Sequence, residues 1–222
     1  MSERLVQLFL LACLVVSIQA RAATPRPFEN EIAAFEARDK TNPPPQHAIL
    51  FVGSSSIRKW TSLAHDLPKH QVINRGFGGS QLADSVFYFD RIVAPYHPKM
   101  IVLYAGSNDI NAGKTPETVA DDFKAFVGKV RQALPEATVA FISINTSPSR
   151  WKDVEKVKKA NNLIADQISH DPKLTYIDTF HPMLDSDGKP RPELYVKDRL
   201  HLNAKGYAIW TSVIAPYLDR AE

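Results

Sequence analysis

Residues 49–60 read ILFVGSSSIRKW, an apolar run of strand length that ends at Gly53 and is followed by three serines. An unbroken apolar run is typical of a strand that is buried on both faces, as in a parallel sheet. Small polar residues directly after such a strand lie at the sheet edge where α/β proteins bind ligands. The stretch therefore predicts the first strand of a parallel sheet. It leaves two roles open for the serines: a nucleophile, or a turn in which Ser56 caps the next helix.

Apolar runs of strand length alternate with helical periodicity along the rest of the chain. The expected strands are 48–52, 71–73, 100–104, 138–142 and 174–177. The expected helices carry apolar stripes that begin at Leu82, Val119, Val154 and Tyr207, with Thr115 and Asn203 as N-caps of the second and the last. This alternation predicts a three-layer α/β/α domain with helices on both faces of a parallel sheet.

The first 22 residues have the pattern of a targeting segment and not of a folded domain. An apolar core over residues 5–18 precedes Ala20-Arg21-Ala22, so we expect a signal peptide that is cleaved after Ala22 or Ala23. The protein would then be exported to the periplasm or secreted. Two alternatives remain open: a buried first helix, and a lipoprotein processed at Cys13. The apolar core is short for a membrane-spanning helix, so we expect no stable membrane insertion after cleavage.

The mature chain is expected to consist of an arm and one domain. Residues 24–46 are proline-rich at both ends and place Phe28, Ile32 and Phe35 on one face of a short helix, which predicts an arm packed on a domain over 47–222. The chain's single cysteine is Cys13, so the mature protein would have no disulfide or thiolate chemistry. A formal net charge of +3 with no basic run gives no reason to expect a nucleic-acid partner.

Four polar clusters fall at the expected strand ends. They are GSSS at 53–56, NRGFGGS at 74–80, AGSNDI at 105–110, and DRLHLN at 198–203 before the last helix. Each cluster alone is compatible with a turn, a helix cap or a surface ion pair. In this order they resemble the sequence blocks of the SGNH (GDSL-type) hydrolases, from about residue 49 to residue 218. That family usually has aspartate before the serine, whereas this chain has Ser54.

The resemblance implies a fold and a set of roles. The fold is a flavodoxin-like, five-stranded parallel sheet in the order 2-1-3-4-5, and the activity is that of a serine esterase without metal or cofactor. Ser55 would be the nucleophile, His201 the general base and Asp198 the residue that orients the base. The backbone N–H groups of Ser55 and Gly79 and the side-chain amide of Asn108 would bind the oxyanion. The departure at Ser54 blurs the alignment, so Ser54 and Ser56 stay open as nucleophiles.

A second D-x-x-H, Asp178 and His181, follows the fifth strand. In the implied order this strand lies three places from the first, about 14 Å away, whereas a base must approach to about 3 Å. The long loop that follows can carry Asp198 and His201 back to the first strand. His201 is therefore the expected base, and His181 remains the alternative. The other five histidines lack such a partner and are expected at the surface: His47, His65, His70, His97 and His170.

The segment SINTSPSRW at 143–151 follows the fourth strand and is expected to form one wall of the substrate site. Asn145, Arg150 and Trp151, together with Ser54, are the expected substrate contacts. Their polarity suits a small or carbohydrate-bearing ester with a short acyl group, acetyl first, better than a long lipid.

Other functions remain compatible with the same residues. An O-acyltransferase of the cell envelope would use them with a sugar as acceptor, and a non-catalytic relative would only bind sugar. A flavodoxin-like phosphate-binding module would leave Asp198, His201 and Asn108 without a role. The sequence contains neither H-E-x-x-H nor G-x-S-x-G. It makes no prediction of oligomeric state.

Overall fold

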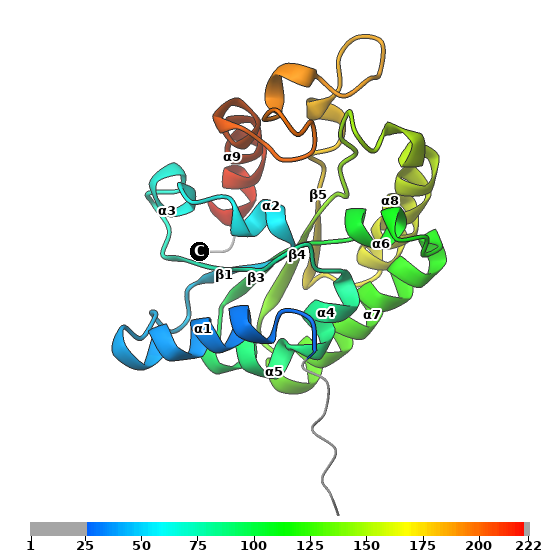
Figure 1. Ribbon diagram of the computed structural model, residues 1–222. Helices are drawn as coiled ribbons and strands as arrows, with labels where there is room; N and C mark the ends of the chain where they lie inside the picture. Colours follow the sequence, from blue (N-terminus) through cyan, green and yellow to red (C-terminus); the bar gives the residue numbers. More distant parts are fainter. Residues whose placement is uncertain (1–25, 220–222) are drawn as a thin grey trace, which may run out of the picture.

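The computed structural model describes residues 26–219, so the expected signal peptide and the alternative at Cys13 lie outside the described residues (Figure 1). Five parallel strands form one sheet in the order β2-β1-β3-β4-β5, which confirms the expected fold class. The strands are β1 (Ile49–Gly53), β2 (Val72–Gly76), β3 (Met100–Tyr104), β4 (Thr138–Ile142) and β5 (Leu174–Ile177). Strand order reverses at β1, which has β2 on one side and β3 on the other.

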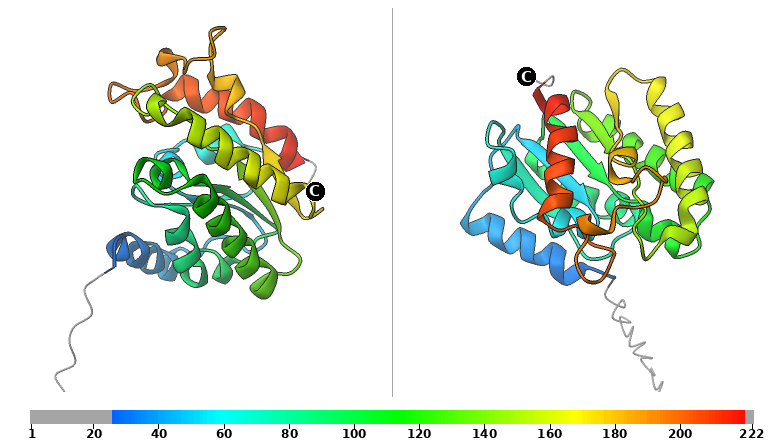
Figure 2. Two further views of the ribbon diagram at one scale, coloured as in Figure 1. Left: turned by 90° about the vertical axis from the view of Figure 1, so that its right-hand side faces the viewer. Right: turned by 90° about the horizontal axis from the view of Figure 1, so that it is seen from above.

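Helices cover both faces of the sheet (Figures 1 and 2). One face packs against α1 (Glu29–Thr41), α4 (Leu82–Phe87), α5 (Phe89–Ile92), α7 (Pro116–Ala133) and α8 (Val154–Ser169). The other packs against α2 (Ser55–Arg58), α3 (Leu63–Asp66) and α9 (Ala204–Leu218). The short α6 (Ser107–Asn111) follows β3, and single 3₁₀ turns are η1 (Ala94–Tyr96), η2 (Trp151–Asp153), η3 (His181–Met183) and η4 (Pro192–Leu194).

Alternation along each strand divides the core into two clusters. In β1, Leu50 and Val52 face the layer of α4, α5, α7 and α8, whereas Ile49 and Phe51 face the layer of α9. Successive side chains of a strand point to opposite faces, and burial of both faces explains why β1 contains no polar side chain. Because β1 pairs in parallel with both β2 and β3, the carboxyl ends of the three strands lie side by side at one edge of the sheet.

The N-caps predicted at Thr115 and Asn203 are confirmed, whereas Ser56 is not a cap, because α2 begins at Ser55. Thr115 Oγ1 accepts the N–H of Thr118 at 3.1 Å, and Asn203 Oδ1 accepts the N–H groups of Lys205 and Gly206 at 2.9 and 3.2 Å. The stripe that begins at Leu82 differs from its expectation, because it is divided between α4 and α5. Tyr88 lies between these helices, with its ring buried and its hydroxyl donating to the carbonyl of Pro27.

The arm forms helix α1 and contacts the loop after β2. Ile32 is fully buried, and the ring of Phe28 meets that of Phe77 edge to face at 5.4 Å. Glu31 Oε2 accepts the N–H of Gly78 at 3.1 Å. Helix α1 thus braces the loop that carries Gly79. None of the helices within residues 26–219 has the length and hydropathy to cross a bilayer.

Candidate active site

The turn after β1 depends on Gly53, whose φ of +133° is rarely adopted by other residues. A Cβ at this position would lie 1.9 Å from the carbonyl oxygen of Tyr104 on β3. The next residue, Ser54, is buried and donates its N–H to the same oxygen at 3.0 Å. This close approach of two strand ends places Ser55 as the first residue of α2, at the carboxyl edge of the sheet.

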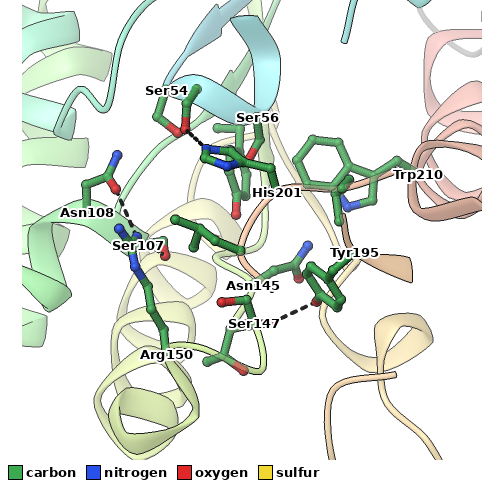
Figure 3. Close-up of a pocket in the computed structure, with 15 residues that line it drawn as sticks. Ser54, Ser56, Ser107, Asn108, Asn145, Ser147, Arg150, Tyr195, His201 and Trp210 are labelled. Atoms are coloured by element: carbon green, nitrogen blue, oxygen red, sulfur yellow. Dashed lines mark hydrogen bonds between the residues drawn. The ribbon is translucent and has the colours of Figure 1, made fainter. Parts of the chain in front are cut away.

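Ser55, His201 and Asp198 form a continuous hydrogen-bonded chain. His201 Nε2 lies 3.0 Å from Ser55 Oγ, and His201 Nδ1 lies 2.6 Å from Asp198 Oδ2. The other carboxylate oxygen of Asp198 accepts the backbone N–H groups of Leu200 and His201, each at 2.9 Å. Figure 3 shows His201 reaching from its loop to the serine turn. Of the three serines, Ser55 is the one whose hydroxyl meets His201.

The hydrogen bonds around Asp198 favour its ionised form. Partial burial acts in the opposite direction, but the donors from His201 and the backbone outweigh it and hold the pKa of Asp198 well below its ordinary value. An ionised Asp198 can accept the Nδ1 proton of His201, which leaves Nε2 free to accept the proton of Ser55.

The second D-x-x-H, Asp178 and His181, forms the same hydrogen bonds but lies outside the pocket beside Ser55. His181 Nδ1 is 2.6 Å from Asp178 Oδ2, and the N–H of His181 donates to Asp178 Oδ1 at 3.2 Å. However, the side chain of His181 is 76% exposed, compared with 17% for His201. The described contacts of His181 include no serine, so this pair is separate from Ser55.

Ser55 and Asn108 line one pocket, and Gly79 does not line it but lies beside Asn108. The backbone N–H groups of Ser55 and Gly79 make no hydrogen bond to another residue of the part that the structure describes. Asn108 Nδ2 donates one proton to the carbonyl of Ser80 at 2.9 Å, and its second proton is unused. A Cβ on Gly79 would lie 3.9 Å from this nitrogen, which places Gly79 and Asn108 next to one another. The arrangement can serve an oxyanion.

Arg150 determines the orientation of the Asn108 amide. Its Nη1 donates to Asn108 Oδ1 at 2.8 Å and to Ser107 Oγ at 2.9 Å (Figure 3). With Oδ1 held by Arg150, Nδ2 must face the opposite side, toward Ser80 and Gly79. Burial lowers the pKa of Arg150, and the nearby Tyr104 and Asp153 oppose the shift.

The pocket beside Ser55 has a volume of about 30 Å³. Of the predicted substrate contacts, Ser54, Asn145 and Arg150 line it. Trp151 does not: it begins η2, and Lys189 Nζ lies 4.8 Å from the centre of its ring. Thr146 and Ser147, which also line the pocket, belong to the segment 143–151 that was expected to form a wall of the site. The lining residues that were not predicted as substrate contacts are Tyr104, Ser107, Tyr195, Leu200, Leu202 and Trp210.

Position along the chain could have identified some of these residues. Tyr104 is the last residue of β3 and Ser107 begins the next helix, α6. Thr146 and Ser147 belong to the segment already assigned to the substrate site. Tyr195 and Trp210 reach the pocket only through the loop and helix that pack across the sheet, and no local pattern marks them.

Comparison with known proteins identifies the family of the chain. Residues 49–209 match the model of the GDSL-like Lipase/Acylhydrolase family. Platelet-activating factor acetylhydrolase IB subunit alpha1 of Pongo abelii is 27% identical over 173 residues, which cover 72% of this chain and 70% of that protein. The human protein of that name is 26% identical over 172 residues, which cover 72% and 70%.

The fold also occurs among solved structures. A GDSL-like lipase from Bacteroides thetaiotaomicron superimposes with a TM-score of 0.75 at 18% identity, covering 86% of this chain and 98% of that chain. The likeness in fold agrees with the match of the family model over most of the chain. This protein belongs to the GDSL-like lipase/acylhydrolase family and is a carboxylic ester hydrolase.

Proposed function

We propose that this protein hydrolyses short acyl esters, acetyl esters first, with Ser55 as the nucleophile, His201 as the general base and Asp198 as the residue that orients it. The observation that carries the proposal is the chain of contacts from Ser55 Oγ through His201 to Asp198. A serine hydroxyl becomes a useful nucleophile only with such a base, and the base needs a third group to fix its tautomer.

The reaction has two halves. Ser55 Oγ attacks the ester carbonyl carbon while His201 Nε2 takes the hydroxyl proton, and Asp198 stabilises the imidazolium that forms. The N–H groups of Ser55 and Gly79 and the amide of Asn108 donate to the oxyanion. When the C–O bond to the alcohol breaks, His201 returns the proton to the leaving oxygen. Water then attacks the acyl-enzyme with His201 again as base, and the carboxylic acid leaves.

The pocket supports a short acyl group. Its volume of about 30 Å³ is room for roughly two water-sized groups, which suits the methyl group of an acetyl ester better than a long chain. The curated relatives are named acetylhydrolases, which favours the same acyl group. The apolar segment at residues 5–18 supports export of the protein. In the periplasm or outside the cell, carbohydrate-bound acetyl esters are available as substrates.

Turnover of p-nitrophenyl acetate by the chain and three variants tests the assignment. We expect Ser55→Ala and His201→Ala each to lower kcat by about 10³-fold or more. His181→Ala is the matched control, because it removes the same side chain from the same type of turn, and we expect unchanged kcat. A Ser55→Ala variant as active as the parent would overturn the proposal.

A chain-length series tests acyl size separately. We expect kcat/KM to fall steadily from p-nitrophenyl acetate to the butyrate and the octanoate, because the pocket has no room for the added methylenes. Equal or rising values along the series would contradict the acetyl assignment and would leave the roles of Ser55 and His201 intact.

A further inference from the structure

Arg150 has an unusual environment for an arginine of this protein. Arg75, Arg91 and Arg131 each pair with a carboxylate at 2.7 to 3.0 Å. Arg150 makes no ion pair within the described residues, and its partners Ser107 Oγ and Asn108 Oδ1 are neutral. The charge of Asp153 acts on Arg150 from nearby but makes no direct contact with it. A partly buried guanidinium without a directly paired carboxylate is costly to maintain, and such groups concentrate at functional sites.

The guanidinium also has unused donors. Its two partners engage Nη1, whereas Nε and Nη2 make no hydrogen bond to any residue between 26 and 219. Arginine carries five N–H donors in a planar fork, so three remain. That edge matches the spacing of two oxygens of a carboxylate or phosphate.

The composition of the pocket favours an anion. Among the described residues that line it there is no aspartate or glutamate, but Arg150 and His201 both line it. Two buried polar atoms of lining residues, Trp210 Nε1 and Thr146 Oγ1, have no hydrogen-bond partner in the described part of the chain. The lining thus offers unused polar atoms, and its one permanent charge is positive.

We propose that Arg150 forms an anion subsite, so that the preferred ester carries a carboxylate or phosphate group on its alcohol part, within reach of Nε and Nη2 of Arg150. This inference rests on the proposed function, since it names the substrate class of the same site. It assigns Arg150 two tasks, binding the anion through its free edge and holding Asn108 through Nη1.

The test uses three aryl acetates that differ in one substituent: 3-acetoxybenzoate, 3-acetoxyphenyl phosphate and the neutral 3-acetoxybenzamide. We expect the protein to prefer at least one anionic ester over the amide by about 10- to 100-fold in kcat/KM, mostly through KM. The anion with the larger preference identifies the group. Arg150→Gln should bring the ratio to about one, because glutamine keeps a hydrogen-bonding amide and loses the charge.

Arg58→Gln is the matched control. It removes the same charge from a residue that is 53% exposed, pairs with Glu31 and does not line the pocket, and we expect it to keep the parent's preference. If Arg150→Gln lowers kcat/KM of all three esters by the same factor, Arg150 only positions Asn108 and the anion subsite is wrong. A parent protein with no preference for either anion overturns it as well.

Failure of the proposed function gives a different result. If the protein cleaves none of the esters, calorimetry with Ser55→Ala still tests the subsite, using 3-hydroxybenzoate, 3-hydroxyphenyl phosphate and 3-hydroxybenzamide. Tighter binding of an anion that disappears in the Ser55→Ala/Arg150→Gln double variant supports the subsite without hydrolysis. Equal binding of all three compounds, or an anion preference that survives in the double variant, overturns it.

Discussion

At the scale of single residues, the carboxylate of Asp198 determines which nitrogen of His201 carries the proton. Asp198 accepts from Nδ1 at 2.6 Å while Nε2 faces Ser55. Asparagine has nearly the same shape, but it can present an N–H to Nδ1 and so stabilise the wrong tautomer. We expect Asp198→Asn to lower kcat on p-nitrophenyl acetate by about 10³- to 10⁴-fold with little change in KM.

Asp178→Asn is the control for this prediction, since Asp178 holds His181 with the same contacts in a turn that is separate from the pocket. Its kcat should equal that of the parent. A full loss of activity in Asp178→Asn, or none in Asp198→Asn, would contradict the assignment of the orienting residue.

At the scale of elements, the junction of β1 and α2 requires a residue without a side chain. A Cβ on Gly53 would meet a backbone oxygen at 1.9 Å, and the φ of +133° is strained for any other residue. We expect Gly53→Ala to lower the free energy of unfolding by about 3 kcal/mol or more, or to prevent folding. Urea unfolding and the yield of folded protein measure the effect.

Gly128 in α7 provides the comparison, because a Cβ there meets nothing within 4 Å. Gly128→Ala should be neutral or stabilising by up to about 1 kcal/mol, since alanine is the better helix former. Equal stability of the two variants would show that the turn after β1 adapts to a side chain.

Helix α3 is attached to the core through Asp66. Asp66 Oδ2 accepts the indole N–H of the buried Trp60 and the hydroxyl of Ser62, each at 2.7 Å. Partial burial opposes ionisation of Asp66, but these donors prevail and its pKa is lowered. The stabilisation by the ionised group is thus complete above its unfolded pKa of about 3.9 and is lost as the pH falls through the lower folded pKa.

We therefore expect Asp66→Asn to lower the free energy of unfolding by about 1 kcal/mol at pH 7 and pH 5. The difference from the parent should shrink below about pH 4. Urea titrations at pH 7, 5 and 3.5 measure it, with Asp187→Asn on an exposed loop as control. A gap that widens on acidification would have the wrong sign.

Local sequence patterns predicted the helices and strands well where the residues of an element themselves determine its structure. The apolar runs located β3, β4 and β5 at their observed bounds, and the caps at Thr115 and Asn203 followed from their hydroxyl and amide groups. The apolar stripe from Leu82 predicted one helix, but the helix is interrupted at Tyr88, whose hydroxyl bonds the distant Pro27.

The same distinction holds for the site. Ser55, Gly79 and Asn108 end or follow strands, so strand order brings them together. By contrast, Trp151 in η2 does not line the pocket, whereas Trp210 of α9 does, because the packing of distant segments decides both. His70, expected at the surface, has a side chain only 3% exposed and lies 3.0 Å from Asp219 of the distant chain end. Such contacts across the fold have no local signature.

At the scale of the whole molecule, α1 is held to the sheet by a nearly buried ion pair. Arg75 of β2 is 6% exposed, and its Nη2 donates to both oxygens of Asp39 at 2.7 and 2.8 Å, while Tyr96 also bonds Asp39. Removing one partner leaves a buried charge unpaired. We expect Asp39→Ala to lower the free energy of unfolding by about 3 to 5 kcal/mol in urea titrations.

The exposed pair of Asp90 and Lys129 gives the contrast, with Asp90 69% exposed at a distance of 2.8 Å. Asp90→Ala should change stability by less than about 1 kcal/mol. If both variants cost the same, α1 contributes little to the folded state.

The repeated D-x-x-H turn supplies an internal spectroscopic reference. His181 and His201 share the same carboxylate contact at 2.6 Å and the same backbone turn, but only His201 faces a serine. In one sample with ¹⁵N-labelled imidazoles, both rings experience identical buffer, temperature and acidity. The difference between their resonances therefore isolates what the hydroxyl and the surrounding cavity add to a histidine that an aspartate already holds.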